Sequence, residues 1–498
     1  MKILVADKFP KDGIAQLQAT GAAVEYQPDL KGEALTEAVR ASGAEVLVVR
    51  GTEVPGDALR AGQLGLDTVL VDGGGLGGTC LQRGCIPSKA LIHAADRFYA
   101  AAGMVGGDRL GISLAEPPRL DFAATMRWKD GIVARLNRGI AQLLAHAKVR
   151  VLSGWAEFSD AKTCIVRGGA EAVTVAAEHV VLAAGSEPAP LPGLPFGGAV
   201  ISSTEALALD AVPPRLAVVG AGYIGLELGI AYRKFGSAVT VIEAADRILP
   251  RYDAALAAPV RRWLDRAGVT LHLGATVDGR NPDGSLAVTT PAGKVAVAAD
   301  RILVAAGRRA RLDGWGFEAM AVDLAGGFVK IDEQCRTSMR RVWAIGDLTG
   351  EPMLAHRASA QALVVAEAIA GQRRRFAPEA IPAICFTEPQ IVSVGLLPSE
   401  AGDSGTAVFP LAASGRALTL EAGDDGGFVR IVYGRGDRRV LGIQAVGREV
   451  AELAGEFAHA LEMGAVLDDI ALTIHAHPTL GESLAEAAMK GLARGLHG

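Results

Sequence analysis

Residues 216–225 read LAVVGAGYIG and combine a short apolar run with the spacing G-x-G-x-x-G. The three glycines are Gly220, Gly222 and Gly225. In a dinucleotide-binding fold the first glycine permits a tight turn, the second lets the backbone approach a pyrophosphate, and the third lets a helix pack on a strand. The start of the helix then offers unpaired N–H groups to the phosphates. The stretch therefore predicts a strand–turn–helix unit that binds a dinucleotide.

The next predicted strand, Ala238–Glu243, ends in an acidic residue. A carboxylate at this position accepts hydrogen bonds from the adenosine ribose and repels a 2′-phosphate, so Glu243 favours NAD over NADP. A glycine-rich turn that binds nothing is the alternative. The preceding strand, the following helix and the acidic strand end together favour the binding site.

Residues 73–89 read GGGLGGTCLQRGCIPSK and hold two cysteines, Cys80 and Cys85. Gly84 eases the bend that would bring the two sulfurs together. A helix predicted to begin near Pro87 would place both sulfurs at its N-terminus, where the helix dipole favours thiolate. Thiol–disulfide exchange needs one thiolate that attacks and one that resolves. Two buried structural cysteines are the alternative, and the absence of a second ligand pair at metal spacing predicts no metal site.

Residues 474–482 read IHAHPTLGE. Histidine is the side chain whose ordinary pKa suits proton transfer near neutrality. Pro478 breaks the chain so that Glu482 can fold back on His477 and hold its tautomer. Taken alone, His477 is better interpreted as a surface histidine. Together with a cysteine pair, it is predicted to be a catalytic base.

The bulk composition limits the kind of protein. A chain of 498 residues predicts about two to four domains. Its 50 basic and 55 acidic residues leave a net charge of -5, which favours neither nucleic acid nor an anionic membrane as partner. No secretory signal is recognisable and no uncharged apolar run reaches the roughly 18 residues of a membrane span. Five cysteines in so long a chain are not a secreted disulfide framework, so a cytoplasmic protein is expected.

Alternating strand and helix patterns predict an α/β fold. It holds two Rossmann-like nucleotide-binding units, with antiparallel strands and a helix after about residue 380. The strands expected are Lys2–Ala6, Ala23–Tyr26, Glu45–Val49, Thr68–Asp72, Leu216–Gly220, Ala238–Glu243, Ile391–Val394, Phe428–Val432 and Val440–Gln444, and the helices include Gly13–Ala19, Gly32–Ala41 and Val450–Met463.

Four motifs give the chain a family resemblance from about Ala58 to its end. They are GGTCLQRGCIPSKALIH at 77–93, VVGAGYIGLELGIAYRKFG at 218–236, VWAIGDLTGEPMLAHRA at 342–358 and TIHAHPTLGE at 473–482. In order and spacing they resemble the pyridine nucleotide–disulfide oxidoreductases. Within that family they are most similar to bacterial dihydrolipoamide dehydrogenases that serve branched-chain 2-oxo acid dehydrogenase complexes.

The resemblance implies a division of the chain and a reaction. The implied units are an extra N-terminal α/β fragment (1–44), an FAD-binding domain (45–190), an NAD-binding domain (191–311), a central domain that continues the FAD site (312–379) and an interface domain for dimerisation (380–498). The implied enzyme is a homodimer that oxidises dihydrolipoamide with NAD+ through a redox disulfide and FAD. Its implied partner is the lipoyl group on the acyltransferase of a 2-oxo acid dehydrogenase complex.

The resemblance also implies roles for single residues. Cys80 would exchange disulfides with lipoamide, and Cys85 would lie against the flavin. His477 would reach the cysteines of the other subunit, with Glu482 as its orienting partner. The implied cofactor contacts are Asp72 on the adenosine ribose, Lys89 beside the flavin and paired with Glu227, segments around Ala156, Gly185 and Ser186, Asp347 on the ribityl chain with Ala355 close by, and Gly307 in the NAD site.

One segment departs from the family. The first glycine loop for FAD should occupy positions 49–54, where the chain reads VRGTEV and keeps only Gly51. Two valines and Glu53 oppose the close, uncharged approach that a phosphate needs, so weakened FAD binding is expected. Residues 1–54 instead resemble the start of a D-2-hydroxyacid dehydrogenase, near 3-phosphoglycerate dehydrogenase. The alternative function is a flavin-poor, non-catalytic scaffold of the same fold.

Other disulfide reductases fit less well. The chain has no C-terminal cysteine pair, which argues against mercuric reductase and the large thioredoxin reductases. Glu243 argues against an NADP-linked glutathione reductase. A complete hydroxyacid dehydrogenase is excluded because only its first fragment resembles this chain.

Overall fold

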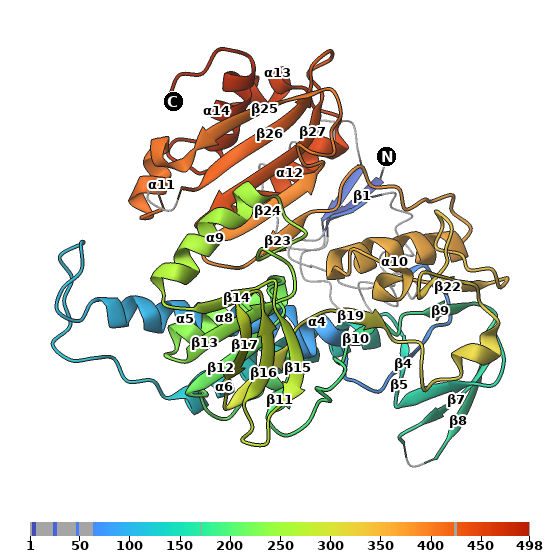
Figure 1. Cartoon of the computed structure of the whole chain (residues 1–498). Helices are drawn as coiled ribbons and strands as arrows, with labels where there is room; N and C mark the ends of the chain where they lie inside the picture. The colour runs from blue at the N-terminus through green and yellow to red at the C-terminus, as the bar shows by residue number, and fades with distance from the viewer. Residues whose placement is uncertain are drawn as a thin grey trace.

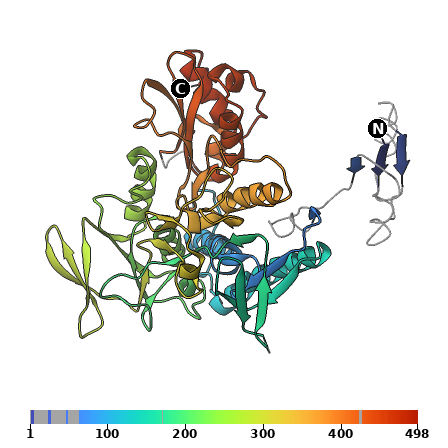
Figure 2. The same cartoon turned by 90° about the vertical axis from the view of Figure 1, so that its right-hand side faces the viewer.

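The computed structural model describes residues 63–169, 171–422 and 426–497, together with the backbone of three N-terminal strands. These strands are β1 (Lys2–Val5), β2 (Ala23–Tyr26) and β3 (Val46–Val48). They form a parallel sheet in the order β2-β1-β3. Figure 2 shows this sheet to one side of the rest of the chain.

The pairing of β3 differs from the sequence-based expectation. A strand forms where Glu45–Val49 predicted one, but it pairs with β1 instead of opening the FAD-binding sheet. A parallel partner was already available in β1, which lies earlier in the chain and carries the same apolar strand pattern. The expected helices over 13–19 and 32–41 and the altered loop at 49–54 lie outside the described residues.

The unit that follows is built on two separate pairs of parallel strands. β4 (Val69–Asp72) pairs with β5 (Arg150–Ser153), and β9 (Val180–Leu182) pairs with β22 (Val342–Ala344). Within the described part of the chain, β4 and β9 each have one strand partner. The other elements of this unit are α4 (Gly78–Arg83), α5 (Cys85–Gly103), α6 (Phe122–His146) and the antiparallel sheet of β6 (Trp155–Phe158), β7 (Thr163–Arg167) and β8 (Val173–Ala176).

The central unit is a parallel sheet of five strands in the order β11-β18-β12-β13-β14. Figure 1 labels β11, β12, β13 and β14 of this sheet. The apolar runs of β12 and β13 are buried on both faces, as expected for parallel strands covered by helices. Its elements are β11 (Val200–Ile201), α7 (Ser203–Ala206), β12 (Arg215–Val219), α8 (Tyr223–Lys234), β13 (Ala238–Glu243), α9 (Ala254–Arg266), β14 (Thr270–Leu273) and β18 (Arg301–Val304), with the antiparallel strands β15 (Thr276–Arg280), β16 (Leu286–Thr290) and β17 (Gly293–Val297) beside it.

A further region combines β10, which precedes the central unit in the chain, with elements that follow that unit. Its antiparallel pair β10-β19 carries residues of the site described below. Its elements are β10 (Ser186–Pro188), β19 (Arg308–Ala310), η1 (Phe317–Met320), β20 (Leu324–Ala325), β21 (Phe328–Val329), η2 (Gly346–Thr349) and α10 (Ala355–Ile369).

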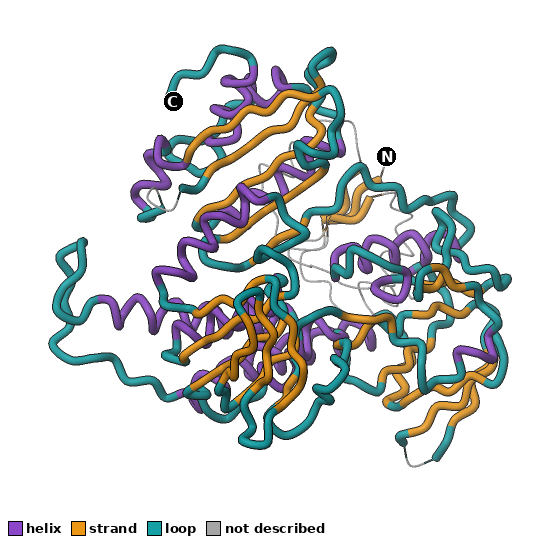
Figure 3. The backbone as a smooth tube through the Cα atoms, in the orientation of Figure 1, coloured by secondary structure: helices purple, strands orange, loops and turns teal. Residues whose placement is uncertain are grey.

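The C-terminal unit is an antiparallel sheet of five strands in the order β23-β24-β27-β26-β25, with helices against it (Figure 3). The strand predictions after residue 380 are confirmed, whereas the helix predicted over Val450–Met463 begins with a 3-10 turn. The elements are β23 (Ala383–Cys385), β24 (Gln390–Gly395), β25 (Ser404–Pro410), η3 (Leu411–Ala413), α11 (Gly415–Thr419), β26 (Phe428–Gly434), β27 (Val440–Gly447), η4 (Val450–Leu453), α12 (Ala454–Glu462), α13 (Leu467–Leu472) and α14 (Glu482–Gly491).

A buried lysine links three segments that are distant in the sequence. Lys234, at the end of α8, donates to Asp96 on α5 and to Glu388 before β24, both at 2.5 Å. Its side chain is only 4% exposed, so the two carboxylates compensate a buried charge. No helix among the described residues has both the length and the apolar character needed to cross a membrane.

Candidate active site

The two cysteines lie on either side of a break between two helices. Cys80 is inside the short helix α4, and Cys85 is the first residue of α5. The prediction that both sulfurs lie at the N-terminus of one helix is therefore wrong for Cys80, because Cys80 belongs to the separate helix α4, which precedes the break. A Cβ on Gly84 would lie 2.8 Å from the Thr79 carbonyl oxygen and 3.2 Å from Cys80 Cα. Glycine thus allows the start of α5 to lie directly against Cys80.

The two thiols are electrostatically unequal. The pKa of Cys85 is lowered to about 7, chiefly by a hydrogen bond from the Cys80 side chain and also by the charge of Lys89, while burial opposes the shift. The same hydrogen bond, with burial, raises the pKa of Cys80 well above its usual range. The reduced pair therefore holds its negative charge on Cys85 and its proton on Cys80.

Lys89 and Glu227 form an ion pair beside the cysteines. Lys89 Nζ lies 2.7 Å from Glu227 Oε2, and Glu227 is 4% exposed. The other oxygen of Glu227 accepts from the Phe386 backbone N–H at 2.9 Å, and the Lys89 ammonium lies 4.5 Å from the centre of the Phe386 ring. The pairing of Lys89 with Glu227 agrees with the expectation. Phe386 was missed, since it stands far from both in the sequence and carries no motif.

The glycine-rich loop after β4 is held by side chains at both ends. Asp72 accepts from the Gly74 backbone N–H through Oδ1 at 2.8 Å. The Leu76 carbonyl accepts from Gln82 at 2.6 Å and from Asn137 on α6 at 2.7 Å. Asn137 was also missed by sequence reasoning, because a single polar residue on a helix face gives no signal of its partner.

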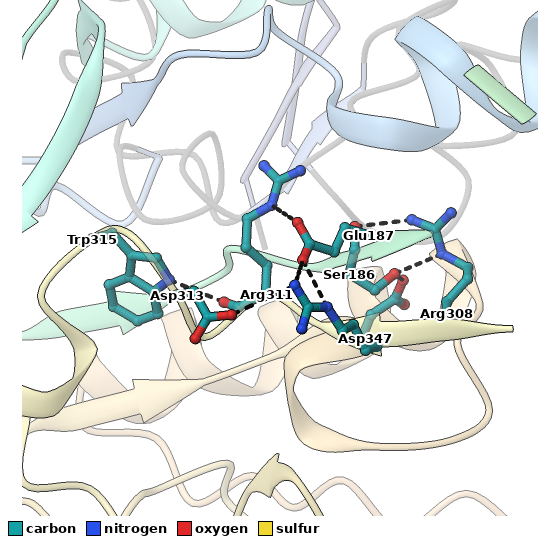
Figure 4. A network of polar contacts seen from close by, with 8 residues as sticks. Ser186, Glu187, Arg308, Arg311, Asp313, Trp315 and Asp347 are labelled. Atoms are coloured by element: carbon teal, nitrogen blue, oxygen red, sulfur yellow. Dashed lines mark hydrogen bonds and ion pairs between the residues drawn. The ribbon is translucent and has the colours of Figure 1, made fainter. Parts of the chain in front are cut away.

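Ser186 and Asp347, which the resemblance assigns separately to the FAD site, contact each other (Figure 4). The Ser186 hydroxyl donates to Asp347 Oδ2 at 2.5 Å. Arg308, the first residue of β19, donates through Nε to the same hydroxyl at 2.8 Å and through Nη2 to the Ser186 carbonyl at 2.9 Å. Gly185 precedes with a φ of +71°, a conformation that glycine adopts without strain. Arg308 is the functional candidate that the sequence did not single out, although it follows Gly307 directly.

The other charged residues drawn in Figure 4 form ion pairs with one another. Glu187 accepts from Arg309 at 2.9 Å and lies 3.6 Å from Arg311 Nε. Asp313 lies 3.6 Å from Arg309, and the Trp315 indole donates to the Arg311 carbonyl at 3.0 Å. These contacts hold β10 against β19 and so fix the backbone beside Ser186.

Ala156 and Ala355, two other predicted residues, have no polar side-chain atom and are placed by the elements that carry them. Ala156 is on β6, where it pairs with Val166. Ala355 opens α10, which is fixed to η2 because Arg357 donates to the Gly350 carbonyl at 2.9 Å. Asp347 lies in η2, so Ala355 starts the helix next to it.

The NAD loop shows why each glycine is needed. Gly220 has a φ of +104°, and a Cβ there would lie 2.6 Å from the Ala305 carbonyl oxygen. A Cβ on Gly225 would lie 2.1 Å from the Gly220 carbonyl oxygen, so helix α8 packs directly on the turn. At Gly222 nothing lies within 4 Å of a Cβ. The open space above Gly222 is where a pyrophosphate could approach the backbone, so the loop fits NAD.

Glu243 stands at the end of β13 and faces this loop. Its carboxylate accepts from the Ala221 N–H at 2.6 Å and from the Ala245 N–H at 2.9 Å. Gly307 directly precedes β19. It has a φ of +149°, and nothing lies within 4 Å of a Cβ built on it. Contact of Glu243 and Gly307 with NAD stays a prediction.

FAD fits the polar groups of the neighbouring site. Asp72 and Asp347 each use one carboxylate oxygen in the hydrogen bonds given above. Among the described residues, the second oxygen of each carboxylate is left to accept a hydrogen bond from a sugar hydroxyl. Both aspartates come from the carboxyl ends of parallel strands, where such sheets bind nucleotides. The set of donors and acceptors therefore matches a dinucleotide that carries ribose and ribityl hydroxyls.

His477 and Glu482 form the predicted contact. His477 Nδ1 lies 2.9 Å from Glu482 Oε1, and the Thr479 backbone N–H donates to Glu482 Oε2 at 2.8 Å. These hydrogen bonds lower the pKa of Glu482, although its partial burial opposes the shift. The His477 side chain is 82% exposed. Within the described residues of one chain, no contact joins His477 to Cys80 or Cys85.

A second histidine–carboxylate pair lies beside the first. His475 Nε2 is 2.7 Å from Glu456 Oε1, and its Nδ1 is 2.9 Å from the Thr473 carbonyl oxygen. Glu456 is on α12, so the pair ties the loop that carries His477 to the body of the C-terminal unit. Sequence reasoning missed Glu456 because nothing local links it to His475.

Known proteins match nearly the whole chain. The family model for pyridine nucleotide-disulphide oxidoreductases matches residues 56–362, and the model for the dimerisation domain of the same family matches 381–488. A dihydrolipoyl dehydrogenase of Pseudomonas aeruginosa is 55% identical over 446 residues, which are 88% of this chain and 95% of that protein. One from Geobacillus stearothermophilus is 41% identical over 88% of this chain and 94% of its own length.

Solved structures agree with the sequence relatives. The crystal structure of LpdA from Mycobacterium tuberculosis has a TM-score of 0.79 at 25% identity and covers 88% of this chain and 98% of its own. The HOCl-induced flavoprotein disulfide reductase RclA from Escherichia coli has a TM-score of 0.74 at 25% identity and covers 86% of this chain and 95% of its own. With its redox pair, its NAD loop and both family domains in place, this chain belongs to the pyridine nucleotide-disulphide oxidoreductases.

Proposed function

We propose that this protein is an NAD-dependent dihydrolipoyl dehydrogenase that uses FAD as its second cofactor. The observation that carries the proposal is the unequal pair Cys80 and Cys85, set beside Lys89 and Glu227 and followed in the chain by an NAD loop. Relatives named dihydrolipoyl dehydrogenase that are 55% and 41% identical over most of the chain support it. The scaffold alternative has no support, since the residues for each step are present.

The cysteines carry out the exchange with the dithiol. One thiol of dihydrolipoamide, once deprotonated, attacks Cys80 of the oxidised pair and forms a mixed disulfide, and Cys85 leaves as thiolate. The lowered pKa of Cys85 makes it the better leaving group. The second substrate thiol then closes lipoamide and releases Cys80. The enzyme now holds two electrons and a proton as the reduced cysteine pair, and NAD+ is the final acceptor of the resulting hydride equivalent.

The cofactors and the orienting residues complete the cycle. Bound FAD would supply the two-electron carrier between the reduced cysteines and NAD+. Lys89, held by Glu227, places a positive charge beside the Cys85 thiolate. Asp72, Ser186 and Asp347 would hold the flavin cofactor, as would the segments around Ala156, Gly185 and Ala355. Gly220, Gly222, Gly225, Glu243 and Gly307 would hold NAD.

His477 is proposed as the base for the substrate thiol, with Glu482 as its orienting partner. Since His477 is exposed and does not meet the cysteines of its own chain, we propose that it serves the cysteines of a second copy. The dimerisation domain at 381–488 supports a homodimer in which the two sites are completed by both chains. Along the chain, we propose domain divisions at 190, 311 and 379, and because β3 pairs with β1 we move the first division from 44 to a point beyond Val48.

The natural substrate is proposed to be the lipoyl group carried by the acyltransferase of a 2-oxo acid dehydrogenase complex. The cytoplasm is the proposed compartment, because a transient catalytic disulfide suits a reducing environment.

The experiment is a rate assay on the purified, flavin-loaded protein. Formation of NADH from dihydrolipoamide and NAD+, followed at 340 nm, is expected at rates typical of enzymes, and Cys85→Ser should abolish it. Reduced glutathione and NADP+ serve as the alternative substrates. A protein that turns over glutathione faster than dihydrolipoamide, or that reduces neither cofactor while carrying flavin, would overturn the proposal.

A further inference from the structure

The two histidines before α14 use their ring nitrogens differently. His477 Nδ1 faces Glu482, and its Nε2 has no partner among the described residues. Both nitrogens of His475 are occupied, because Nδ1 lies 2.9 Å from the Thr473 carbonyl oxygen and Nε2 lies 2.7 Å from Glu456 Oε1. His475 therefore has no nitrogen left to take a proton from a substrate, whereas His477 has one.

Both atoms that face the His475 ring are hydrogen-bond acceptors. A carbonyl oxygen and a carboxylate have no hydrogen to donate. The arrangement is therefore complete only when both ring nitrogens carry a proton, which makes the ring a cation beside the Glu456 anion. The His475 side chain is 9% exposed, so this bond is shielded from water on the histidine side. A charge-assisted hydrogen bond of this kind is roughly twice as strong as one between neutral groups.

His475 is also the tether of an exposed segment. Residues 472–478 are exposed at every position except His475. Among the described residues, its contact with Glu456 on α12 is the one hydrogen bond or ion pair that joins 474–478 to an element outside 473–482. Without this contact, the polar interactions of the segment would all be made within the segment itself.

Gly481 packs on the same pair from the other end of the segment. A Cβ built on it would lie 3.5 Å from His475 Cδ2 and 3.6 Å from Glu456 Oε2, so the backbone there is in contact with both side chains. Glu482, the orienting partner of the base, follows Gly481 directly. The pair therefore contacts the chain on both sides of His477.

We propose that His475 is a positioning residue, which holds the base His477 in place through its ion pair with Glu456. The inference rests on the proposed function, because it takes His477 to be the base for the dihydrolipoamide thiol. A base acts only within hydrogen-bond reach of the proton that it takes, so a small displacement of an exposed segment slows the reaction. The first histidine of the segment thus fixes the second, and only the second meets the substrate.

Other charged groups surround the ion pair. Burial raises the pKa of Glu482, but its hydrogen bonds and the charges of His477 and His475 lower the pKa overall. The charge of His475 therefore helps to keep the orienting partner of the base ionised. The remaining charged side chains nearby line a pocket together with residues 478–481, and they are Arg416, Glu449 and Glu452.

The first test measures the dithiol half-reaction of the flavin-loaded enzyme by stopped flow. Glu456→Ala removes the acceptor for His475 and should slow this half-reaction about 10- to 100-fold, the range for a lost hydrogen bond to a charged group. Electron transfer from NADH to an artificial acceptor should be unchanged. His497→Ala is the matched control, because it removes another histidine–carboxylate pair of the same unit, in which His497 Nδ1 lies 2.8 Å from Glu486 Oε1. It should leave both half-reactions unchanged.

The second test separates the charge of the pair from support of the fold. The amide of Glu456→Gln can donate to Nε2, so this variant suits a neutral His475 ring. As the pH rises from about 6 to about 9, the unaltered chain loses the second ring proton and the bond that depends on it, whereas Glu456→Gln keeps its bond. The dithiol rate of Glu456→Gln, divided by that of the unaltered chain, should therefore rise about 3- to 10-fold. The ratio removes the effect of groups that titrate in both proteins.

Hydrogen–deuterium exchange over residues 473–482 gives a readout that needs no substrate, and exchange should be faster in Glu456→Ala than in His497→Ala. If these two variants match in dithiol rate and in exchange, or if Glu456→Ala loses both half-reactions equally, His475 does not position the base and the enzyme proposal stands. A ratio that does not change with pH would overturn the ion pair on which the inference depends. If the unaltered, flavin-loaded chain does not oxidise dihydrolipoamide, the proposed function fails, and the inference fails with it.

Discussion

Cys85 owes its lowered pKa first to the hydrogen bond from Cys80 and then to Lys89. Above pH 7 the reduced Cys85 is mainly thiolate, and this reactivity is lost as the pH falls below 7. In Cys80→Ala the main cause is removed, so the pKa should rise toward the ordinary value, whereas the hydroxyl of Cys80→Ser should preserve most of the shift. Iodoacetamide alkylation of Cys85 as a function of pH measures both. The same midpoint in the two variants would contradict the hydrogen-bond explanation.

His477→Ala should slow the dithiol half-reaction by about 10²–10⁴-fold, the usual effect of losing a general base. The transfer from NADH to an artificial electron acceptor does not need this proton, so it should change little. Stopped-flow measurement of the two half-reactions gives the comparison, with Glu482→Gln as a milder change that keeps the imidazole. An equal loss in both half-reactions would point to a folding defect.

Single residues differ in how far the sequence could predict them. The contact of His477 with Glu482 was predictable because the two are close in the chain and separated by a proline. Lys89 and Glu227 were paired only through the family resemblance, since they meet from two different helices. Phe386 and Asn137 contribute through a ring face, a backbone N–H or an amide, and such contacts depend on tertiary packing that no local pattern encodes.

The break between α4 and α5 depends on one glycine. In Gly84→Ala the new Cβ would press on the Thr79 carbonyl and on Cys80 Cα, so the helices should move apart at a cost of about 1–3 kcal/mol. The pair should then close its disulfide more slowly and become easier to reduce. Gly103→Ala, at the other end of α5 with nothing within 4 Å, is the control and should leave both stability and redox behaviour unchanged. Redox titration against glutathione and thermal unfolding provide the readouts.

Two glycines of the NAD loop should respond in opposite ways. Gly225→Ala forces a Cβ onto the Gly220 carbonyl, so it should destabilise the protein by about 1–3 kcal/mol. Gly222→Ala meets open space and should change stability by less than about 0.5 kcal/mol, yet weaken NAD binding about 10-fold because the methyl group occupies the approach of the phosphate. Unfolding curves and NADH titrations separate the two. Stability losses of equal size would refute this division of roles.

Elements with a clear pattern of apolar residues along the sequence were predicted well. The strand Ala238–Glu243 forms with the predicted bounds, because an apolar run between turn residues has few alternatives. The start of the helix predicted over Val450–Met463 was wrong: residues 450–453 form a 3-10 turn, which shares the apolar spacing of an α-helix over so short a stretch. β3 was predicted as a strand, but its partner was not, since strand pairing is a non-local choice.

At the scale of the whole molecule, the C-terminal unit exposes apolar side chains close to His477. Ile474 is 97% exposed and Leu472 77%, and both stand within five residues of His477 in the chain. Exposed apolar groups gathered at one place mark an interface. Ile474→Asp should therefore shift the protein toward monomers in sedimentation velocity and reduce dithiol oxidation more than NADH-dependent dye reduction. Leu324→Asp, on an exposed strand of another unit, is the control. A monomer with full dithiol activity would show that His477 serves its own chain.

The two separate strand pairs of the flavin unit have a consequence for handling the protein. Within the described residues, β4 and β9 each leave one side without a strand partner. Unpaired strand edges act as templates on which another chain can add. At high concentration the flavin-free protein should therefore tend to aggregate through these edges, by a route unrelated to the twofold dimer. Supplying flavin during expression, or lowering the rate of synthesis, should then raise the soluble yield more than any change at the surface of the C-terminal unit.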